Sequence, residues 1–432
     1  MTPSARRPGL ALPPSATRPI LLVIVAVLLV LAGLRLRSGY DALLFVEPAQ
    51  RSGVRYIAIG RGAIDLVSRR LETEDFFAGR RGGDRVYPPA TYAMLWPLIA
   101  SGSLEAARWT WAAVLTVSLA WLCWISARAS GFRDPLARLA MGLLPPASLA
   151  TTLALGTGQL TIPVVALATA SVLRLARSPG TRGDEATAAA LFTLASVKPT
   201  LVAPVGWLLL FLPRSFVPAG IAACLYACVT GIALALRGSV ASPRPVVPRP
   251  VVPRGPLFIE ENMFASGYAN LQNWLVHLGI GFPWVFLPPI LGLALLGWWT
   301  WRHRDGDPWL LLAVAGLVAR FCFYHRHYDD LLVLPVLVAL ARLASGATSS
   351  MAVADPSRAT GEIRQASLWT LFAVAGSLVM PATLPFAVRQ AAATGTWSAA
   401  LVLLVHAAAH GPPLQIRGGS LSSRVDSTSP GP

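Results

Sequence analysis

Long runs of apolar residues alternate with short polar loops along most of the chain. The run ILLVIVAVLLVLAGL begins at Ile20, and a similar run, FLPPILGLALLGWW, occupies 286–299. A helix that crosses the hydrocarbon of a bilayer needs about 20 apolar residues. The pattern therefore predicts an all-α polytopic membrane protein, because only helices and closed barrels satisfy their backbone groups in lipid.

We expect about 12 transmembrane helices. The arginines of the loops between them place both termini in the cytoplasm, because basic loops stay on that side. The segment YPPATYAMLWPLIA, from Tyr87, is short and carries three prolines, so we expect it to form an interfacial or re-entrant helix. The expected spans are 20–36, 104–127, 135–153, 159–175, 186–197, 200–213, 216–236, 282–301, 308–323, 331–345, 367–386 and 395–409.

The spans and loops predict one integral-membrane domain at 1–410. Its first extracytoplasmic loop, 37–103, is acidic and carries the interfacial helix. A second extracytoplasmic loop, 238–281, contains the proline-rich repeat RPVVPRPVVP, which favours a polyproline II spacer. We expect a disordered cytoplasmic tail at 411–432.

Composition narrows the class of protein further. The chain is 54% hydrophobic and 13% charged, about half the usual charged fraction. Its net charge of +16 is spread over many loops and not gathered on one face, so we expect no nucleic-acid partner. No P-loop and no GxGxxG on a strand–helix unit is present, which excludes a soluble nucleotide-sugar enzyme.

Four polar stretches fall on the same side of the membrane in this topology. They are the acidic first loop, the turn GTGQL (156–160), the helix break VKPT (197–200) and the motif YHRHYDD (324–330). Ionisable residues at the edge of a membrane are candidates for function, because charge is costly there. Their convergence predicts a polar cavity that opens to the extracytoplasmic side.

Five features of the chain, taken in order, resemble a known family. They are the acidic loop with YPP, the Gly-Gln turn, the Lys-Pro break, an Asn/Gln-rich late loop and a His-rich edge. The family is glycosyltransferase family 87, the polyprenol-phosphate-mannose-dependent mannosyltransferases, which have the GT-C fold. The resemblance covers most of 40–345 and implies a bacterial plasma-membrane enzyme. Such an enzyme transfers mannose from a polyprenyl-phosphate donor to a lipid or glycan acceptor, with inversion and without a cofactor.

Sugar transfer to a hydroxyl needs a base for the acceptor proton. The resemblance places the catalytic aspartate in the first extracytoplasmic loop. There Asp65, in GAIDLVSRRL with Arg69 one helical turn on, matches best, and Asp41 is its rival. The alternative for Asp65 is structural, as a helix cap or as an ion-pair partner of Arg69.

The departing phosphate needs cationic hydrogen-bond donors. Their candidates are Lys198, His325, Arg326 and His327, with Asp329 and Asp330 behind them to orient a histidine or the arginine. Further substrate-binding candidates are Gln159, Tyr87, Asn270 and Gln272.

Other interpretations of the same residues stay open at this point. The Lys198 side chain could instead extend to the membrane interface. The motif YHRHYDD could form an interfacial loop whose charged side chains pair with one another. A metal ion held by His325, His327 and an aspartate fits the spacing, but an ion-pair network needs none, and we expect no metal. A transporter or lipid flippase, with a His/Arg/Asp pathway for protons or substrate, is the rival function.

Overall fold

The computed structural model describes residues 14–46, 62–80, 87–176, 181–212, 216–239, 270–281, 283–323, 325–347, 359–381 and 383–410. Within these ranges the chain is helical and contains no strand, which confirms the all-α class. Three predicted features lie outside the described residues. They are the proline-rich repeat, the arginines near the N-terminus that precede residue 14, and the tail at 411–432.

Five helices of the described chain are long and apolar enough to cross a membrane. Each coincides with a predicted span, so the polytopic membrane class is confirmed. Apolar side chains of the first helix, among them Val23 and Val30, are more than half exposed, as expected of a surface that faces lipid. The five helices comprise α1 (Pro14–Leu44), α4 (Leu104–Ala129), α10 (Val217–Ala235), α13 (Leu287–Arg302, extended by a 3₁₀ turn at Trp284–Phe286) and α17 (Phe386–His410).

Shorter helices fill the interior and the remaining side of the bundle. Nearly every residue of α14 and α15 is buried, because apolar side chains cover all faces of both helices. The shorter helices are α7 (Thr161–Ala176), α8 (Arg182–Ala195), α9 (Pro199–Phe211), α14 (Pro308–Cys322) and α15 (Leu334–Ser345). The longer α16 (Ala359–Val379) lies beside them.

The span predicted at 135–153 is not one continuous helix. It consists of α5 (Pro135–Ala147) and α6 (Leu149–Thr157), which meet at an angle of 43°. Pro145 and Pro146 end α5, and the Ser148 side chain accepts a hydrogen bond from the Thr151 amide to begin α6. The guanidinium of Arg35 donates to the carbonyls of Ala147 and Val379, so α1 holds the break against the end of α16.

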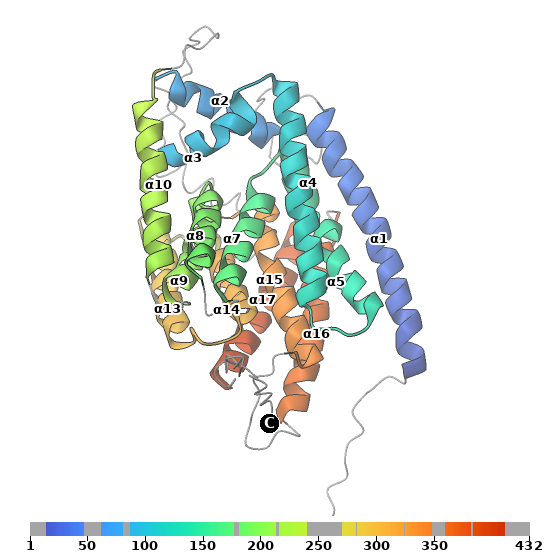
Figure 1. Ribbon diagram of the computed structural model, residues 1–432. Helices are drawn as coiled ribbons and strands as arrows, with labels where there is room; N and C mark the ends of the chain where they lie inside the picture. The colour runs from blue at the N-terminus through green and yellow to red at the C-terminus, as the bar shows by residue number, and fades with distance from the viewer. Residues whose placement is uncertain are drawn as a thin grey trace, which may run out of the picture.

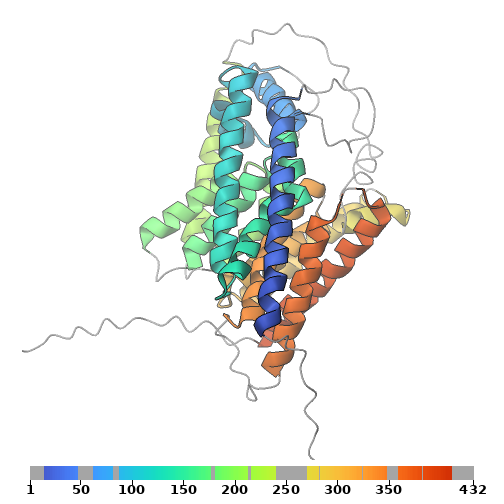
Figure 2. The same cartoon turned by 90° about the vertical axis from the view of Figure 1, so that its right-hand side faces the viewer.

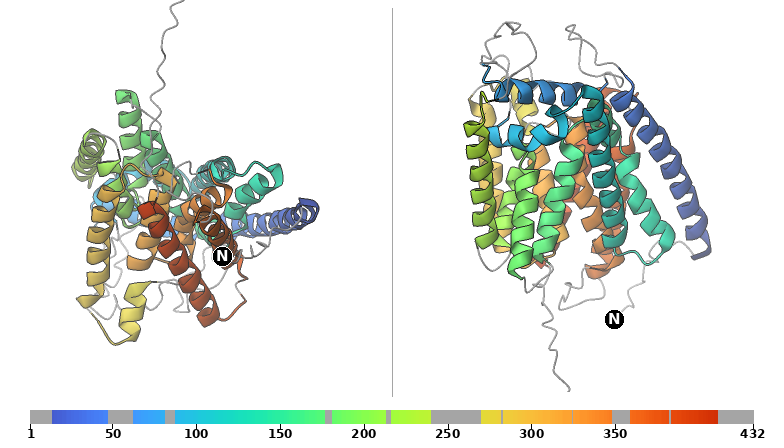
Figure 3. Two further views of the ribbon diagram at one scale, coloured as in Figure 1. Left: turned by 90° about the horizontal axis from the view of Figure 1, so that it is seen from below. Right: turned by 45° about the horizontal axis from the view of Figure 1, so that its top comes forward.

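Two helices of the first loop form a roof over the upper end of the bundle. They are α2 (Ile64–Phe77) and α3 (Pro89–Leu95), the latter extended by a π-helical turn at Trp96–Ala100. Figures 1 and 3 show that they lie across the ends of α7, α8 and α9, whereas α4 and α10 rise beside them. The view in Figure 2 shows the same arrangement from the side, with α1 running the height of the bundle.

The roof is joined to the shorter helices beneath it by specific contacts. The Thr91 hydroxyl donates to the carbonyl of Val197 at 2.9 Å, in the break between α8 and α9. The amide of Ala63 donates to the carbonyl of Gly156 at 2.9 Å, at the end of α6. The two predicted helix breaks, GTGQL and VKPT, therefore both meet the roof.

Candidate functional site

The polar centre of the site is the buried carboxylate of Asp329. It lies on a 3₁₀ helix, His327–Val333, which connects α14 to α15. One of its oxygens accepts hydrogen bonds from Lys198 Nζ at 2.7 Å and from Thr161 Oγ1 at 2.6 Å. Three segments far apart in the chain thus meet at one oxygen atom. We call Lys198, Thr161, Asp329 and His325 the inner cluster.

Lys198 reaches this position because the chain breaks between α8 and α9. Pro199 begins α9, where its missing amide hydrogen leaves no bond unmade, and Lys198 before it has a non-helical backbone with φ −125° and ψ 81°. The lysine side chain is buried, with its ammonium 4.9 Å from the centre of the Tyr328 ring. It forms an ion pair inside the protein, so the interpretation that it snorkels to the interface is wrong.

His325 completes the inner cluster. Its Nδ1 lies 3.4 Å from the second oxygen of Asp329, and the backbone amide of Arg326 donates to that same oxygen at 3.3 Å. The imidazole is fully buried, and among the described residues neither Nδ1 nor Nε2 makes a hydrogen bond, so its contact with Asp329 is electrostatic. Asp329 is thus a close charged neighbour of His325, and its role in orienting the imidazole stays a prediction.

The charge states of the inner cluster follow from burial and pairing. Burial alone would raise the pKa of Asp329, but the Lys198 ammonium and the His325 imidazole outweigh it and hold the pKa below its usual range. Burial lowers the pKa of His325, so its imidazole is neutral. The cluster is an ammonium–carboxylate pair with a neutral histidine beside it.

Asp65 lies in the roof, in the first turn of α2, and is partly buried. The start of α2 is fixed against the GTGQL turn, because a Cβ atom on Gly158 would lie 2.7 Å from the Cβ of Leu66. Gly158 has a φ of +72°, a left-handed conformation that glycine adopts at little cost. The same turn leads directly into Thr161, so one segment positions both the Asp65 helix and the inner cluster.

Tyr87 lies within electrostatic range of both Asp65 and Asp329. Burial raises the pKa of Tyr87, the Arg69 guanidinium lowers it, and the carboxylates of Asp329 and Asp65 raise it further. The two carboxylates are thus both electrostatic neighbours of one phenol. Arg69 lies over the Tyr87 ring at 4.8 Å and pairs with Glu72 at 2.5 Å. Among the described residues, Arg69 therefore pairs with Glu72 and not with Asp65.

The rival aspartate occupies a different environment. The Asp41 side chain is 57% exposed and lies 3.7 Å from the exposed guanidinium of Arg37, four residues earlier on α1. Of the two candidate bases, Asp65 is the more buried.

Three predicted substrate-binding residues form hydrogen bonds with backbone groups of the protein itself. Gln159 accepts from the amide of Leu160 at 3.1 Å. Asn270 caps α12 (Leu271–His277) and donates to the Phe323 carbonyl at 2.7 Å, and Gln272 donates to the Val285 carbonyl at 3.0 Å. The sequence analysis missed Asn273, which is fully buried and whose side-chain amide has no hydrogen-bond partner in the described part of the chain.

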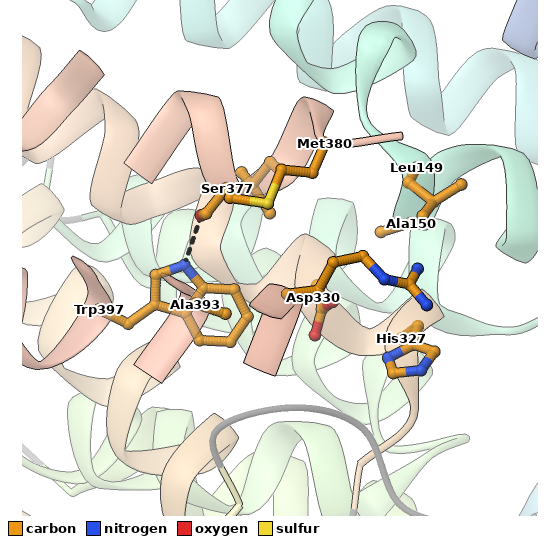
Figure 4. A pocket seen from close by; sticks show the side chains of 10 residues that line it. Leu149, Ala150, His327, Asp330, Ser377, Met380, Ala393 and Trp397 are labelled. Carbon is orange, nitrogen blue, oxygen red and sulfur yellow. Dashed lines mark hydrogen bonds between the residues drawn. The ribbon is translucent and has the colours of Figure 1, made fainter. Parts of the chain in front are cut away.

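The two aspartates of the YHRHYDD motif contact different partners on two sides of the 3₁₀ helix. Asp329 faces Lys198, whereas Asp330 accepts from Arg320 Nε at 2.6 Å. His327 and Asp330 line a cavity bounded by α6, α16 and α17, so His327 does not join His325 in the inner cluster (Figure 4). The sequence analysis also missed Arg320, although a charged residue inside a predicted span was the available signal.

No group of three or more His, Cys, Asp or Glu side chains in the described ranges is arranged to hold a metal ion. The sequence model of glycosyltransferase family 87 matches residues 86–335. This range contains Tyr87, Lys198 and the whole YHRHYDD motif, and it begins after Asp65. Neither the curated proteins nor the solved structures contain a match to the chain.

Proposed function

The chain belongs to glycosyltransferase family 87 and is a membrane glycosyltransferase, and we propose the donor, the acceptor and the stereochemistry of the sugar transfer that it performs. The donor is a polyprenyl-phosphate sugar, with mannose as the sugar. The acceptor is a hydroxyl of a lipid or glycan, and transfer takes place on the extracytoplasmic face with inversion. These details rest on the family resemblance and on the chemistry of the residues that the fold brings together.

The observation that carries the proposal is the position of Asp65. The roof helix that carries the partly buried Asp65 begins against the GTGQL turn, and that turn leads into Thr161 of the buried cluster that contains Lys198 and His325. Asp65 lies in the first turn of its helix, α2. A base and cationic hydrogen-bond donors on opposite sides of a reacting carbon are what a single displacement requires.

The proposed reaction has one step. The acceptor oxygen attacks the anomeric carbon as Asp65 takes the hydroxyl proton, and the bond from that carbon to the phosphate oxygen breaks. The electron pair of the broken bond leaves with the polyprenyl phosphate. Because attack and departure occur on opposite faces of the sugar, the configuration at the anomeric carbon inverts. One carboxylate is sufficient for this route.

His325 and the Lys198–Asp329 pair are proposed to face the departing phosphate. Asp329 holds the ammonium and orients the imidazole, so both keep fixed positions as charge develops on the leaving group. Arg326 and His327 are the further phosphate candidates on the same connection. The family is one of glycosyltransferases, which argues against the transporter interpretation of these residues.

The test is transfer by the purified protein in phospholipid nanodiscs with three radiolabelled donors. They are polyprenyl-phosphate mannose, polyprenyl-phosphate glucose and GDP-mannose, each offered with a membrane lipid extract as acceptor. We expect label to enter acceptor lipid from polyprenyl-phosphate mannose, with an α linkage from a β-linked donor. Transfer from GDP-mannose alone would overturn the donor, and transfer from the glucose donor alone would overturn the sugar.

A further inference from the structure

Arg320 is a buried cation for which the proposed reaction has no use. It lies in the last turn of α14, and its side chain is 0% exposed. Its Nε donates to Asp330 at 2.6 Å, and its guanidinium lies 5.4 Å from the centre of the Trp397 ring. A buried ion pair seldom adds stability compared with apolar residues of similar size, so stability alone does not explain this arginine.

Arg320 holds one of two consecutive aspartates. Asp330 pairs with Arg320, whereas Asp329 accepts from Lys198 Nζ at 2.7 Å. Both aspartates lie in the first turn of the 3₁₀ helix, whose successive residues point about 120° apart. A shift of this helix by one residue would therefore bring Asp330 to Lys198 in place of Asp329. Lys198 itself cannot select between them, because its ammonium is a point charge that pairs with either carboxylate.

The two neighbouring carboxylates also repel each other. Burial raises the pKa of Asp330 to about 6, against the Arg320 guanidinium, which lowers it, and the charge of Asp329 raises it further. Arg389 lowers this pKa as well, but by less than Arg320 does. Two buried carboxylates side by side each need a cation, and Arg320 is the cation that donates a hydrogen bond to Asp330.

Trp397 connects Arg320 with the C-terminal helices. Its buried indole donates from Nε1 to Ser377 Oγ at 3.0 Å, as Figure 4 shows. Ser377 lies on α16 and Trp397 on α17. A cation over an aromatic face is attracted by the ring, more strongly where water is excluded. Arg320 is therefore held from a part of the chain beyond residues 86–335, which match the family model.

We propose that Arg320 is a positioning residue for sugar transfer. By holding Asp330, it leaves Asp329 as the carboxylate that pairs with Lys198. The inference rests on the proposed function, in which the inner cluster faces the departing group. It adds that α16 and α17, through Trp397, take part in fixing the geometry of the site.

Without Arg320, both carboxylates would compete for one ammonium. Where Asp330 takes Lys198, His325 loses the charged neighbour that now lies at 3.4 Å. A small displacement of a catalytic group lowers turnover strongly, so we expect Arg320→Gln to lose transfer about 10- to 100-fold. Arg320→Lys keeps a cation beside Asp330 and should lose less. Binding of farnesyl phosphate, a short analogue of the donor lipid, should fall by less than transfer does in both variants.

The part assigned to the C-terminal helices has its own test. Trp397→Leu removes the ring face over the guanidinium, whereas Ser377→Ala removes only the acceptor of the indole N–H. We expect Trp397→Leu to lose more transfer per folded protein than Ser377→Ala. The reverse order would show that the C-terminal helices do not act on the site through the Trp397 ring.

The main experiment is a double-mutant cycle between Arg320 and Asp329, which contact different partners. The denaturant midpoint of unfolding is measured in mixed micelles, by tryptophan fluorescence, for Arg320→Gln, Asp329→Asn and the two together. Each single variant leaves one buried charge without its partner, so each midpoint should fall. In the combined variant Asp330 and Lys198 remain as a free carboxylate and a free ammonium, which can pair. The combined fall should therefore be smaller than the sum of the single falls.

Two controls separate this exchange of partners from general electrostatics. In an Asp330→Asn background the coupling should be lost, because no second carboxylate is left to reach Lys198. Arg342→Gln with Asp329→Asn is the matched pair, because Arg342 forms the corresponding ion pair with Asp307 at 2.8 Å, at the other end of α14, and here the falls should add. Additive falls in the main cycle, or coupling that persists in the Asp330→Asn background, would overturn the proposal.

Transfer measurements separate this inference from the proposed function. Arg320→Gln with Asp330→Asn removes the competing carboxylate together with the cation, so this variant should recover most of the transfer that Arg320→Gln loses. Equal loss in the two variants would overturn the positioning role. If the wild type transfers nothing from polyprenyl-phosphate mannose, the proposed function fails, whereas the unfolding cycle still decides whether Arg320 selects the carboxylate that pairs with Lys198.

Discussion

The Lys198–Asp329 pair should hold the site together, and replacing Lys198 by methionine tests this directly. Both side chains are less than a tenth exposed, and the lysine contributes two donor contacts, to Asp329 at 2.7 Å and to Thr161 at 3.4 Å. In Lys198→Met the carboxylate stays buried with only Thr161 and the Arg326 amide as donors. Breaking a buried pair in this way costs about 3–5 kcal/mol.

A second substitution should recover most of that stability. Lys198→Met with Asp329→Asn leaves no uncompensated charge, and the Asn oxygen still accepts from Thr161. Replacing both partners of a buried pair is often nearly neutral, so we expect the double variant to lie within about 1 kcal/mol of the wild type. Its sugar transfer should still be lost, because His325 no longer has a charged partner.

The measurement is the free energy of unfolding in mixed micelles, followed by tryptophan fluorescence across a denaturant titration. Arg342→Met is the control, since Arg342 pairs with Asp307 but its side chain is 23% exposed, and the loss should be smaller. If Lys198→Met is as stable as the wild type, or the double variant is no more stable than the single one, the ion pair does not hold the 3₁₀ helix in place.

Two further predictions concern the roof. Gly158→Ala should destabilise the protein by at least about 1 kcal/mol and reduce transfer. The φ of residue 158 is +72°, and the new Cβ would meet Leu66, the neighbour of Asp65. Unchanged stability in a denaturant titration would contradict this prediction. Thr91→Val should cost about 1–3 kcal/mol, because the buried carbonyl of Val197 loses its donor. Limited proteolysis should then cut α3 faster than in the wild type, and an unchanged digestion rate would show that this bond does not hold the roof.

The helices were predictable from the sequence because their signal is local. Apolar length and flanking arginines identify a span without knowledge of its neighbours, and the helix starts at Pro199 and Pro308 fall at the prolines that favour them. The break between α5 and α6 was missed, because the apolar run continues across it. Its position depends on Pro145, Pro146 and the tertiary contact with Arg35.

Most residues of the site could be predicted from the sequence, but which of them form ion pairs with one another could not. The motif at 324–330 and Lys198 could be chosen as charged residues at helix ends. That Asp329 faces Lys198 while Asp330 faces Arg320 depends on the turn of a 3₁₀ helix and on partners far away in the chain. Asn270 and Gln272 were predicted as ligands for a sugar, and the structure shows that each also donates to a backbone carbonyl, which the sequence could not show.

The central claim is that Asp65 is the base of a sugar transfer, and Asp65→Asn tests it most directly. The assay is transfer of labelled mannose from polyprenyl-phosphate mannose by protein in nanodiscs, with farnesyl phosphate binding as the check that the variant is folded. We predict that Asp65→Asn loses transfer by about 100-fold or more and binds the lipid normally, whereas Asp41→Asn keeps wild-type transfer. Retained transfer in Asp65→Asn, or its loss in Asp41→Asn alone, would contradict the account.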